Sequence, residues 1–369
     1  MILAYLLTLL SLTIYSFSLV DPNITFFQSK WWEVFREKMV YLGYYQRQTS
    51  WMLYFFLVVF LFIFHYFFVK KYKKFNPVKL ALLIGIILLI SYPLLSHDFF
   101  NYMFDARIMT FYHQNPYLFK AQDFPSDAWL RFMQWTHRTY PYGLSFLPIT
   151  LIPSFLSLGK FFLSFLFFKS IFIIFYFLAV FFLNKISKEY AIIFATHPLI
   201  IIEGLVNSHN DLIAVSFGII GIYFLFRPIH NSGSQFIARL FFTFSLGIKY
   251  ITLPIVFLTN TNVKRNTIIF TVLLGVILYL SMKSEIQAWY FLNLFIFIPF
   301  FVQSINRLNI FFFGLLTSYY PYIRLGGWDS FEKVDTKHWI IVFAAILNLL
   351  YLLIPYKKII FKHKNKDPN

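Results

Sequence analysis

Ionisable and polar side chains gather at residues 96–117, SHDFFNYMFDARIMTFYHQNPY, directly after an apolar run. The acids Asp98 and Asp105 are seven residues apart, which is two helical turns, so a helix over 98–111 would let both face one direction. Arg107 lies near them on a different stripe of that helix. Ionisable groups at a membrane edge are costly, so this stretch is predicted to be a functional site.

Three further polar clusters follow along the chain. The motif NSHND occupies 207–211 between two short apolar runs, four residues after Glu203, and such a polar run is costly unless it lines an aqueous cavity. Lys249 in GIKY lies between two runs that are each short for a full span. A lysine at such a break can reach a phosphate as a point charge. The motif AWY, ending in Trp289 and Tyr290, precedes another apolar run.

These residue types suit the transfer of a sugar from a phosphate. A carboxylate can deprotonate the attacking hydroxyl, and arginine or lysine can neutralise the leaving phosphate. Tyrosine and tryptophan can stack on sugar faces at the membrane interface. The histidines show no HxxxH or HExxH spacing, so no cofactor is certain and a divalent cation stays possible.

Each cluster also has an ordinary structural alternative. The acids could be solvated residues after a helix end, and NSHND could be a polar turn. Arg107 could pair with Asp105 or with lipid phosphates, and Lys249 could reach the membrane surface with its long side chain. The aromatic pair of AWY could be an ordinary interface anchor.

The composition indicates an integral membrane protein. Of 369 residues, 59% are hydrophobic and 13% are charged, whereas soluble domains are about 45–50% apolar and about 25% charged. The chain has no cysteine, which excludes disulfides, thiolate catalysis and cysteine-bound zinc. Its net charge of +17 is explained by lysines that face anionic lipid, so no nucleic-acid partner is expected.

Hydropathy predicts an all-α polytopic fold. Clear apolar runs lie at 1–20, 51–69, 78–95, 161–183, 266–281, 290–303, 308–320 and 338–356, with shorter runs at 190–206, 212–226, 235–248 and 250–259. The first run reads as a transmembrane helix, not a signal peptide. The segment 141–157, interrupted by prolines, is expected to be a half-helix or an interfacial element, and 96–140 a structured cap of short helices.

The distribution of charge predicts the orientation. With the N-terminus in the cytoplasm, the inside loops carry 17 basic and 2 acidic residues, and the outside segments carry 13 basic and 12 acidic residues, as the positive-inside rule requires. KKYKK at 70–74 and the basic tail 357–369 anchor this assignment. Every polar cluster then falls on the outer side of a single transmembrane domain, 1–369.

In this order the polar blocks resemble the GT-C superfamily of membrane glycosyltransferases, which use polyprenyl-phosphate sugars. Bacterial α-mannosyltransferases of lipomannan-type synthesis are the most similar group, and the GPI mannosyltransferase I family is a looser match. The segment HPLIIIEGLVNSHND at 197–211 is similar to the family's NPLxLxEGxxNxHND, and GIKY and AWY follow in order. The family's earlier blocks are, in order, an acid, an arginine, NPY and PYG. The matching residues in this chain are Asp98, Tyr102, Arg107, Asn115, Pro116, Tyr117, Tyr140, Pro141, Tyr142 and Gly143.

The resemblance implies a GT-C-like helix bundle with short outer-face helices, broken or re-entrant segments and an active site on the outer face. Asp98 would be the general base and Asp105 a possible second acid, while Arg107 and Lys249 would hold the donor phosphate. Relatives differ in whether they need a metal. The sugar or acceptor pocket would be shaped by Tyr102, Asn115, Tyr117, Tyr140, Tyr142, Glu203, Asn207, His209, Asn210, Asp211, Trp289 and Tyr290.

The predicted function is the transfer of a hexose, expected to be mannose, from a polyprenyl-phosphate carrier to a glycan or glycolipid acceptor. The predicted location is the plasma membrane of a prokaryote, with the site facing outside. A secondary transporter or a flippase of lipid-linked sugars is the alternative, because broken helices also mark transporters. The clustering at the outer edge and the lack of an inverted repeat disfavour it. An enzyme that transfers an aminosugar or a whole glycan is a third possibility.

Overall fold

The computed structural model describes residues 1–227 and 232–354, and within these ranges the regular structure is helical, with no strand. The predicted basic tail 357–369 lies outside the described residues. The α-helices are α1 (Ile2–Tyr15), α2 (Lys30–Val40), α3 (Arg47–Lys70), α4 (Pro77–Leu88), α5 (Asp98–Thr110), α6 (Phe146–Leu156), α7 (Phe161–Ile186), α8 (Lys188–Thr196), α9 (Asp211–Leu225), α10 (Ser232–Leu246), α11 (Val263–Lys283), α12 (Ile298–Asn306), α13 (Asn309–Thr317) and α14 (Phe331–Leu353). Shorter 3₁₀ or π segments are η1 (Ser16–Leu19), η2 (Tyr41–Tyr45), η3 (Tyr72–Lys74), η4 (Ala121–Asp123), η5 (Leu130–Phe132), η6 (Ile200–Val206), η7 (Tyr250–Phe257), η8 (Ala288–Phe297) and η9 (Pro321–Leu325).

Within the described ranges, six helical segments are long and apolar enough to cross a membrane, which confirms the predicted all-α polytopic class. The pair α8 and η6 is bent by 67° and adds a seventh span if it is counted as one. Pro198 stands at this bend, where it cannot continue the hydrogen-bond ladder of α8. The six segments are Ile2–Leu19, Arg47–Lys70, Phe161–Ile186, Val263–Lys283, Ala288–Asn306 and Phe331–Leu353.

Two predicted spans are wrong in length. The run 78–95 is helical only as α4, which ends at Leu88, and the chain continues in turns towards α5. Pro93 provides no backbone donor there, and the N–H of Tyr92 instead donates to the Ser16 hydroxyl at 2.8 Å. The run 308–320 contains only α13, nine residues long. Both runs are apolar, but neither forms one continuous helix.

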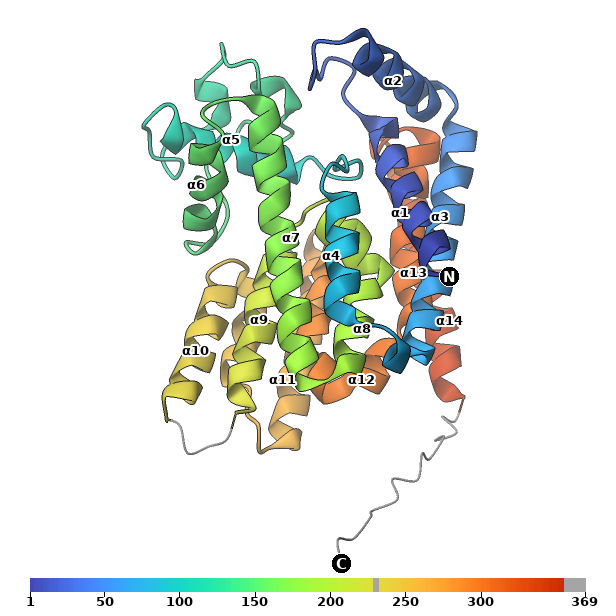
Figure 1. Cartoon of the computed structure of the whole chain (residues 1–369), viewed down its shortest axis with the longest axis vertical. Helices are drawn as coiled ribbons and strands as arrows, with labels where there is room; N and C mark the ends of the chain where they lie inside the picture. The colour runs from blue at the N-terminus through green and yellow to red at the C-terminus, as the bar shows by residue number, and fades with distance from the viewer. Residues whose placement is uncertain (228–231, 355–369) are drawn as a thin grey trace, which may run out of the picture.

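The segments 21–50 and 96–140 and the basic α3–α4 link, which hydropathy assigns to opposite sides, lie towards opposite ends of the molecule. Figure 1 shows α2, α5 and α6 at one end, drawn at the top, and α12 with the α3–α4 link towards the other. That link carries the basic cluster KKYKK. The top end is the predicted cap: α5, η4 and η5 supply short helices within 96–140. The helix α2 was not predicted, because its sequence is polar and charged.

The helix α9 lies below the cap in Figure 1. It packs against α7 and α10, and most of its residues are buried. A helix that is apolar around its whole circumference is expected to be enclosed by protein or lipid. Its first residue is Asp211, so this buried helix delivers a carboxylate to the region below the cap.

Candidate active site

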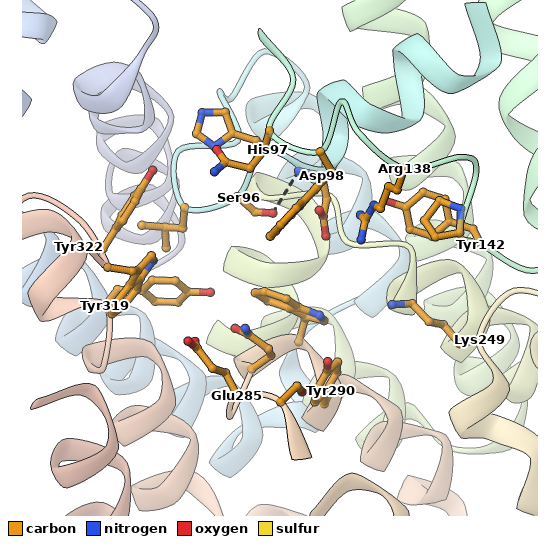
Figure 2. A pocket seen from close by; sticks show the side chains of 18 of the residues that line it. Ser96, His97, Asp98, Arg138, Tyr142, Lys249, Glu285, Tyr290, Tyr319 and Tyr322 are labelled. Atoms are coloured by element: carbon orange, nitrogen blue, oxygen red, sulfur yellow. Dashed lines mark hydrogen bonds between the residues drawn. The ribbon is translucent and has the colours of Figure 1, made fainter. Parts of the chain in front are cut away.

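A cavity of about 900 Å³ lies where the cap meets the helix bundle. Five of the residues predicted from the sequence line it: Asp98, Tyr142, Lys249, Trp289 and Tyr290. Figure 2 shows Asp98 near the middle of this cavity, with Arg138, Tyr142 and Lys249 on one side of it. On this side the cavity therefore brings two cationic side chains, Arg138 and Lys249, near the carboxylate of Asp98.

Asp98 is the first residue of α5, and its backbone N–H donates to the Ser96 hydroxyl at 3.2 Å. The first turn of a helix carries partial positive charge, which stabilises negative charge placed there. The Asp98 side chain is 19% exposed. It therefore presents an accessible carboxylate to the cavity, as the role of a base requires.

Asp105 lies two turns further along the same helix but is buried. Burial raises the pKa of Asp105 to about 8, with Arg138 opposing this shift and Asp98 adding to it. At neutral pH the Asp105 carboxyl therefore carries a proton. The prediction that both acids share one helix is confirmed, yet their environments make them chemically different.

His209 lies between two acids. Its Nδ1 is 3.7 Å from Asp98 Oδ2, and its Nε2 is 3.3 Å from Glu203 Oε2. Trp289 stacks on the imidazole, with ring centroids 4.0 Å apart and an interplanar angle of 18°. Asn207 donates from its Nδ2 to Glu203 Oε2 at 3.1 Å. The motif NSHND therefore lies directly behind Asp98, as a fully buried support.

Asp211 holds the lysine of GIKY. Lys249 Nζ is 2.9 Å from Asp211 Oδ2, and Asn293 donates from Nδ2 to Asp211 Oδ1 at 2.9 Å. The carboxylate of Asp211 is fully buried, whereas the Lys249 side chain is 23% exposed. Lys249 is thus held by the buried Asp211 and still lines the cavity.

A buried lysine fixes the turn before α9. Lys169, in the middle of α7, donates to the carbonyl oxygens of Leu205 at 2.6 Å and Val206 at 2.8 Å, and to the Ser208 hydroxyl at 3.1 Å. Ser208 has a positive φ of 58°, a conformation that is unfavourable for most residues. The hydrogen bonds from Lys169 therefore stabilise the turn at the residue whose backbone conformation is unfavourable.

Several predicted pocket residues support the cavity from behind or lie in the cap. Tyr102 accepts from the Asn210 N–H at 3.4 Å, and its ring meets Tyr142 edge-on. In the cap, Asn115 Oδ1 accepts from the Tyr117 N–H at 2.9 Å. The Tyr117 ring contacts Tyr140, whose ring in turn contacts Tyr142. NPY therefore forms a turn whose Tyr117 packs against Tyr140, the residue before the PYG block.

The structure does not bring Arg107 to this cavity. Arg107 Nε is 2.7 Å from Asp127 Oδ2, and its guanidinium lies between the rings of Phe111 and Trp129, 3.9 and 4.2 Å from their centroids. It borders a separate cavity of about 210 Å³. Although burial opposes it, hydrogen bonds from Arg107, the Trp129 N–H and Tyr112 lower the pKa of Asp127.

Sequence reasoning missed four polar residues of this region. Arg138 lines the cavity and lies two residues before Tyr140, which was predicted from the sequence together with the PYG block. Lys169 and Asn293 stand alone in apolar runs, where a polar residue is itself a signal of function or buried contact. Glu285 lies in a short polar link and carried no such signal.

The part of the chain that the structure describes contains no preformed metal-binding cluster. No group of three or more His, Cys, Asp or Glu side chains there is arranged to hold an ion. Asp98, His209 and Glu203 are the nearest to such a set, but the imidazole separates the two acids. The carboxylates that line the cavity and remain accessible to a divalent cation are Asp98 and Glu285.

An all-helical bundle with several possible membrane spans, and a wide polar cavity beneath a cap, is typical of a membrane glycosyltransferase. Residues 8–265 match the MptA_B family, described as Alpha-(1->6)-mannopyranosyltransferase, N-terminal domain. Because this match covers more than half of the 369 residues, the chain belongs to that family. Comparisons with curated proteins and with solved structures gave no match.

Family membership confirms the predicted resemblance and the predicted class, a membrane mannosyltransferase. It also disfavours the transporter alternative, because the family is one of transferases. The matched region includes Asp98, the NSHND motif and Lys249. The match ends before AWY and before the C-terminal helices α12 to α14.

Proposed function

We propose that this protein transfers mannose from a polyprenyl-phosphate carrier to a hydroxyl group of a glycan or glycolipid, with Asp98 as the general base. The observation that carries the proposal is the cavity itself, in which Asp98 and the cations Arg138 and Lys249 face one another. Such a site can take a proton and stabilise a leaving phosphate in the same step.

In the proposed reaction, the acceptor oxygen attacks the anomeric carbon of the sugar. The bond from that carbon to the phosphate oxygen breaks, and its electron pair leaves with the phosphate. Asp98 takes the acceptor proton. Arg138 and Lys249 stabilise the negative charge on the leaving phosphate, Arg138 as a planar fork and Lys249 as a point charge. This proposal gives Arg138 the donor-binding role that the family resemblance implied for Arg107.

The supporting residues have separate proposed tasks. Asp211 pairs with Lys249 and Asn293 donates to Asp211, so the two hold the lysine in place. His209, on which Trp289 stacks, holds the carboxylate of Asp98 in place. Asp105 is proposed to be a neutral neighbour and not a second base, because its carboxyl keeps its proton at neutral pH. That neutrality leaves the charge of Arg138 available to the donor phosphate.

The proposed location is the outer side of a prokaryotic plasma membrane. The support is the segregation of KKYKK and the cap at opposite ends, together with the tendency of basic loops to stay inside. A divalent cation remains part of the proposal only as an added ligand of the donor phosphate. Transfer measured with and without a chelator decides whether it contributes.

The test is transfer of radiolabelled mannose from polyprenyl-phosphate mannose, with membrane extract of the native host as acceptor. Asp98→Asn removes the proton acceptor and keeps the side-chain volume, so the rate is expected to fall about 10²- to 10⁴-fold. Asp123→Asn, which changes an exposed acid of the cap, is the matched control and should transfer at the wild-type rate. Equal rates for Asp98→Asn and wild type would refute the role of Asp98.

A further inference from the structure

The cavity has a second wall, opposite the two cations and built by the later part of the chain. Figure 2 shows Tyr319 and Tyr322 on the other side of Asp98 from Arg138 and Lys249. The wall continues through Trp328, and its remaining polar residues are Glu285, Gln287 and Lys337. None of the steps proposed for the donor uses this wall.

Aromatic rings form the upper part of the wall. The rings of Tyr322 and Trp328 are stacked, with centroids 5.7 Å apart and an interplanar angle of 17°. Tyr319 lies against the same tryptophan at 6.3 Å. Tyr322 and Trp328 both line the cavity and are only partly buried, so part of each ring is exposed to a ligand there.

An ion pair forms the lower part of the wall. Lys337 Nζ is 3.1 Å from Glu285 Oε2 and lies over the Trp328 ring, 4.9 Å from its centroid. The Lys337 side chain is 6% exposed and the Glu285 side chain 40%. The lysine is therefore enclosed, while the carboxylate that it orients reaches the cavity.

The chemistry of the second wall differs from that of the first. The charges of Glu285 and Lys337 balance, so the wall offers no net positive charge to a phosphate. A hexose has one face of C–H groups that can pack on an aromatic ring, whose face is electron-rich. Its hydroxyl groups can donate to a fixed carboxylate, and such charge-assisted hydrogen bonds are strong. The ligand that suits this wall is a neutral sugar.

We propose that this wall is the acceptor subsite, in which Trp328 and Glu285 bind a neutral hexose unit of the acceptor glycan beside Asp98. The inference rests on the proposed transfer reaction, because it needs the opposite wall to hold the donor. Asp98 then lies between the two substrates, where an acceptor hydroxyl loses its proton as it attacks. The wall falls outside the matched residues 8–265, so acceptor choice belongs to the C-terminal part of the chain.

Direct binding of α-(1→6)-linked mannobiose tests the subsite without the donor. The purified protein in detergent is titrated with this disaccharide, and binding is followed by saturation-transfer NMR. Trp328→Ala is expected to weaken binding about tenfold. Trp339→Ala is the matched control, because Trp339 is exposed on α14 and outside the cavity; it should bind as wild type. Absence of binding to wild type, or equal binding by Trp328→Ala, would overturn the proposal.

A second pair of variants covers the case in which Trp328→Ala fails to fold. Glu285→Gln keeps the shape of the side chain and is also expected to weaken mannobiose binding about tenfold, whereas Glu332→Gln, at an exposed position of α14, should not. Wild-type affinity in Glu285→Gln would then overturn the subsite. Failure of the proposed function would give a different result: the wild-type protein would bind the disaccharide but transfer no mannose from the carrier.

Discussion

Two acids on one helix have opposite properties because of what surrounds them. Asp98 stands at the helix start and opens to the cavity. Asp105 is buried below it, and burial raises its pKa to about 8. Spacing in the sequence places both on α5, but only the packing around each carboxyl separates the proposed base from its neutral neighbour.

Asp105 is expected to make stability depend on pH. Burial raises the pKa of Asp105 from its ordinary value of 3.8 to about 8. Between these two pH values the unfolded chain loses this proton while the folded protein keeps it. The free energy of unfolding therefore falls as the pH rises from about 4 to about 8. Asp105→Asn is expected to reduce this fall, measured as the difference between unfolding midpoints at pH 5 and pH 8.

The control for this measurement is Asp123→Asn, an exposed acid in the same cap. It should keep the wild-type dependence on pH, because it leaves the buried Asp105 carboxyl in place. If Asp105→Asn and wild type lost stability equally between pH 5 and pH 8, the protonated state assigned to Asp105 would be wrong.

Among the elements, α7 acts on the site through one side chain. Lys169 supplies the donors for two carbonyl groups and one hydroxyl at the turn before α9. Lys169→Met removes all three hydrogen bonds from a buried turn and leaves only the Ser208 hydroxyl, which donates to the Leu205 carbonyl at 3.0 Å. It is therefore expected to lower the free energy of unfolding by about 2 kcal/mol or more. The turn would also shift and slow transfer.

Thermal unfolding and mannose transfer, measured on the same preparation, check this prediction. Lys185→Met removes an exposed lysine from the same helix and should change neither quantity by much. A Lys169→Met protein with wild-type stability and rate would show that the turn holds its shape without the lysine.

The link before α6 meets the GIKY segment at two glycines. The Ser145 N–H donates to the Gly247 carbonyl at 2.9 Å, and a Cβ added at Gly143 would collide with that same carbonyl group. Gly143→Ala must therefore push the cap away from Lys249. Because small misplacements of catalytic groups are costly, transfer is expected to fall about 10²-fold.

Gly275→Ala provides the comparison for this substitution. A Cβ at Gly275, within α11, would meet nothing within 4 Å, and alanine is more favourable than glycine inside a helix by about 0.5–1 kcal/mol. This variant should keep its activity and unfold at a slightly higher temperature. Full activity in Gly143→Ala would mean that the close approach of the two segments is not needed.

At the scale of the whole molecule, the capped end and the basic end are proposed to face opposite sides of the membrane. The chain has no cysteine, so single introduced cysteines report position without background. Ser126→Cys lies in the cap and Lys71→Cys in the α3–α4 link, both at exposed positions. A membrane-impermeant maleimide is expected to label Ser126→Cys on intact cells and Lys71→Cys only after permeabilisation. The reverse pattern would place the cavity on the inner side.

The sequence by itself determined the class of protein, and it predicted five residues that line the cavity. Apolar runs and basic loops predict a polytopic helical protein because hydropathy is a local property of the chain. The order of the polar blocks carried the family resemblance, which the match over 8–265 confirms. The two acids were expected to face one direction if 98–111 is a helix, and α5, Asp98–Thr110, does contain both.

Only the tertiary structure decided which charges share the cavity. Arg107 is the arginine that the sequence singles out, but Asp127 holds Arg107 elsewhere while Arg138 lines the cavity. Lys169 reaches across to the turn after Leu205, and Lys337 reaches Glu285, 52 positions away. Contacts between distant segments depend on how helices pack. A local pattern cannot encode that packing, because it reports only on neighbours along the chain.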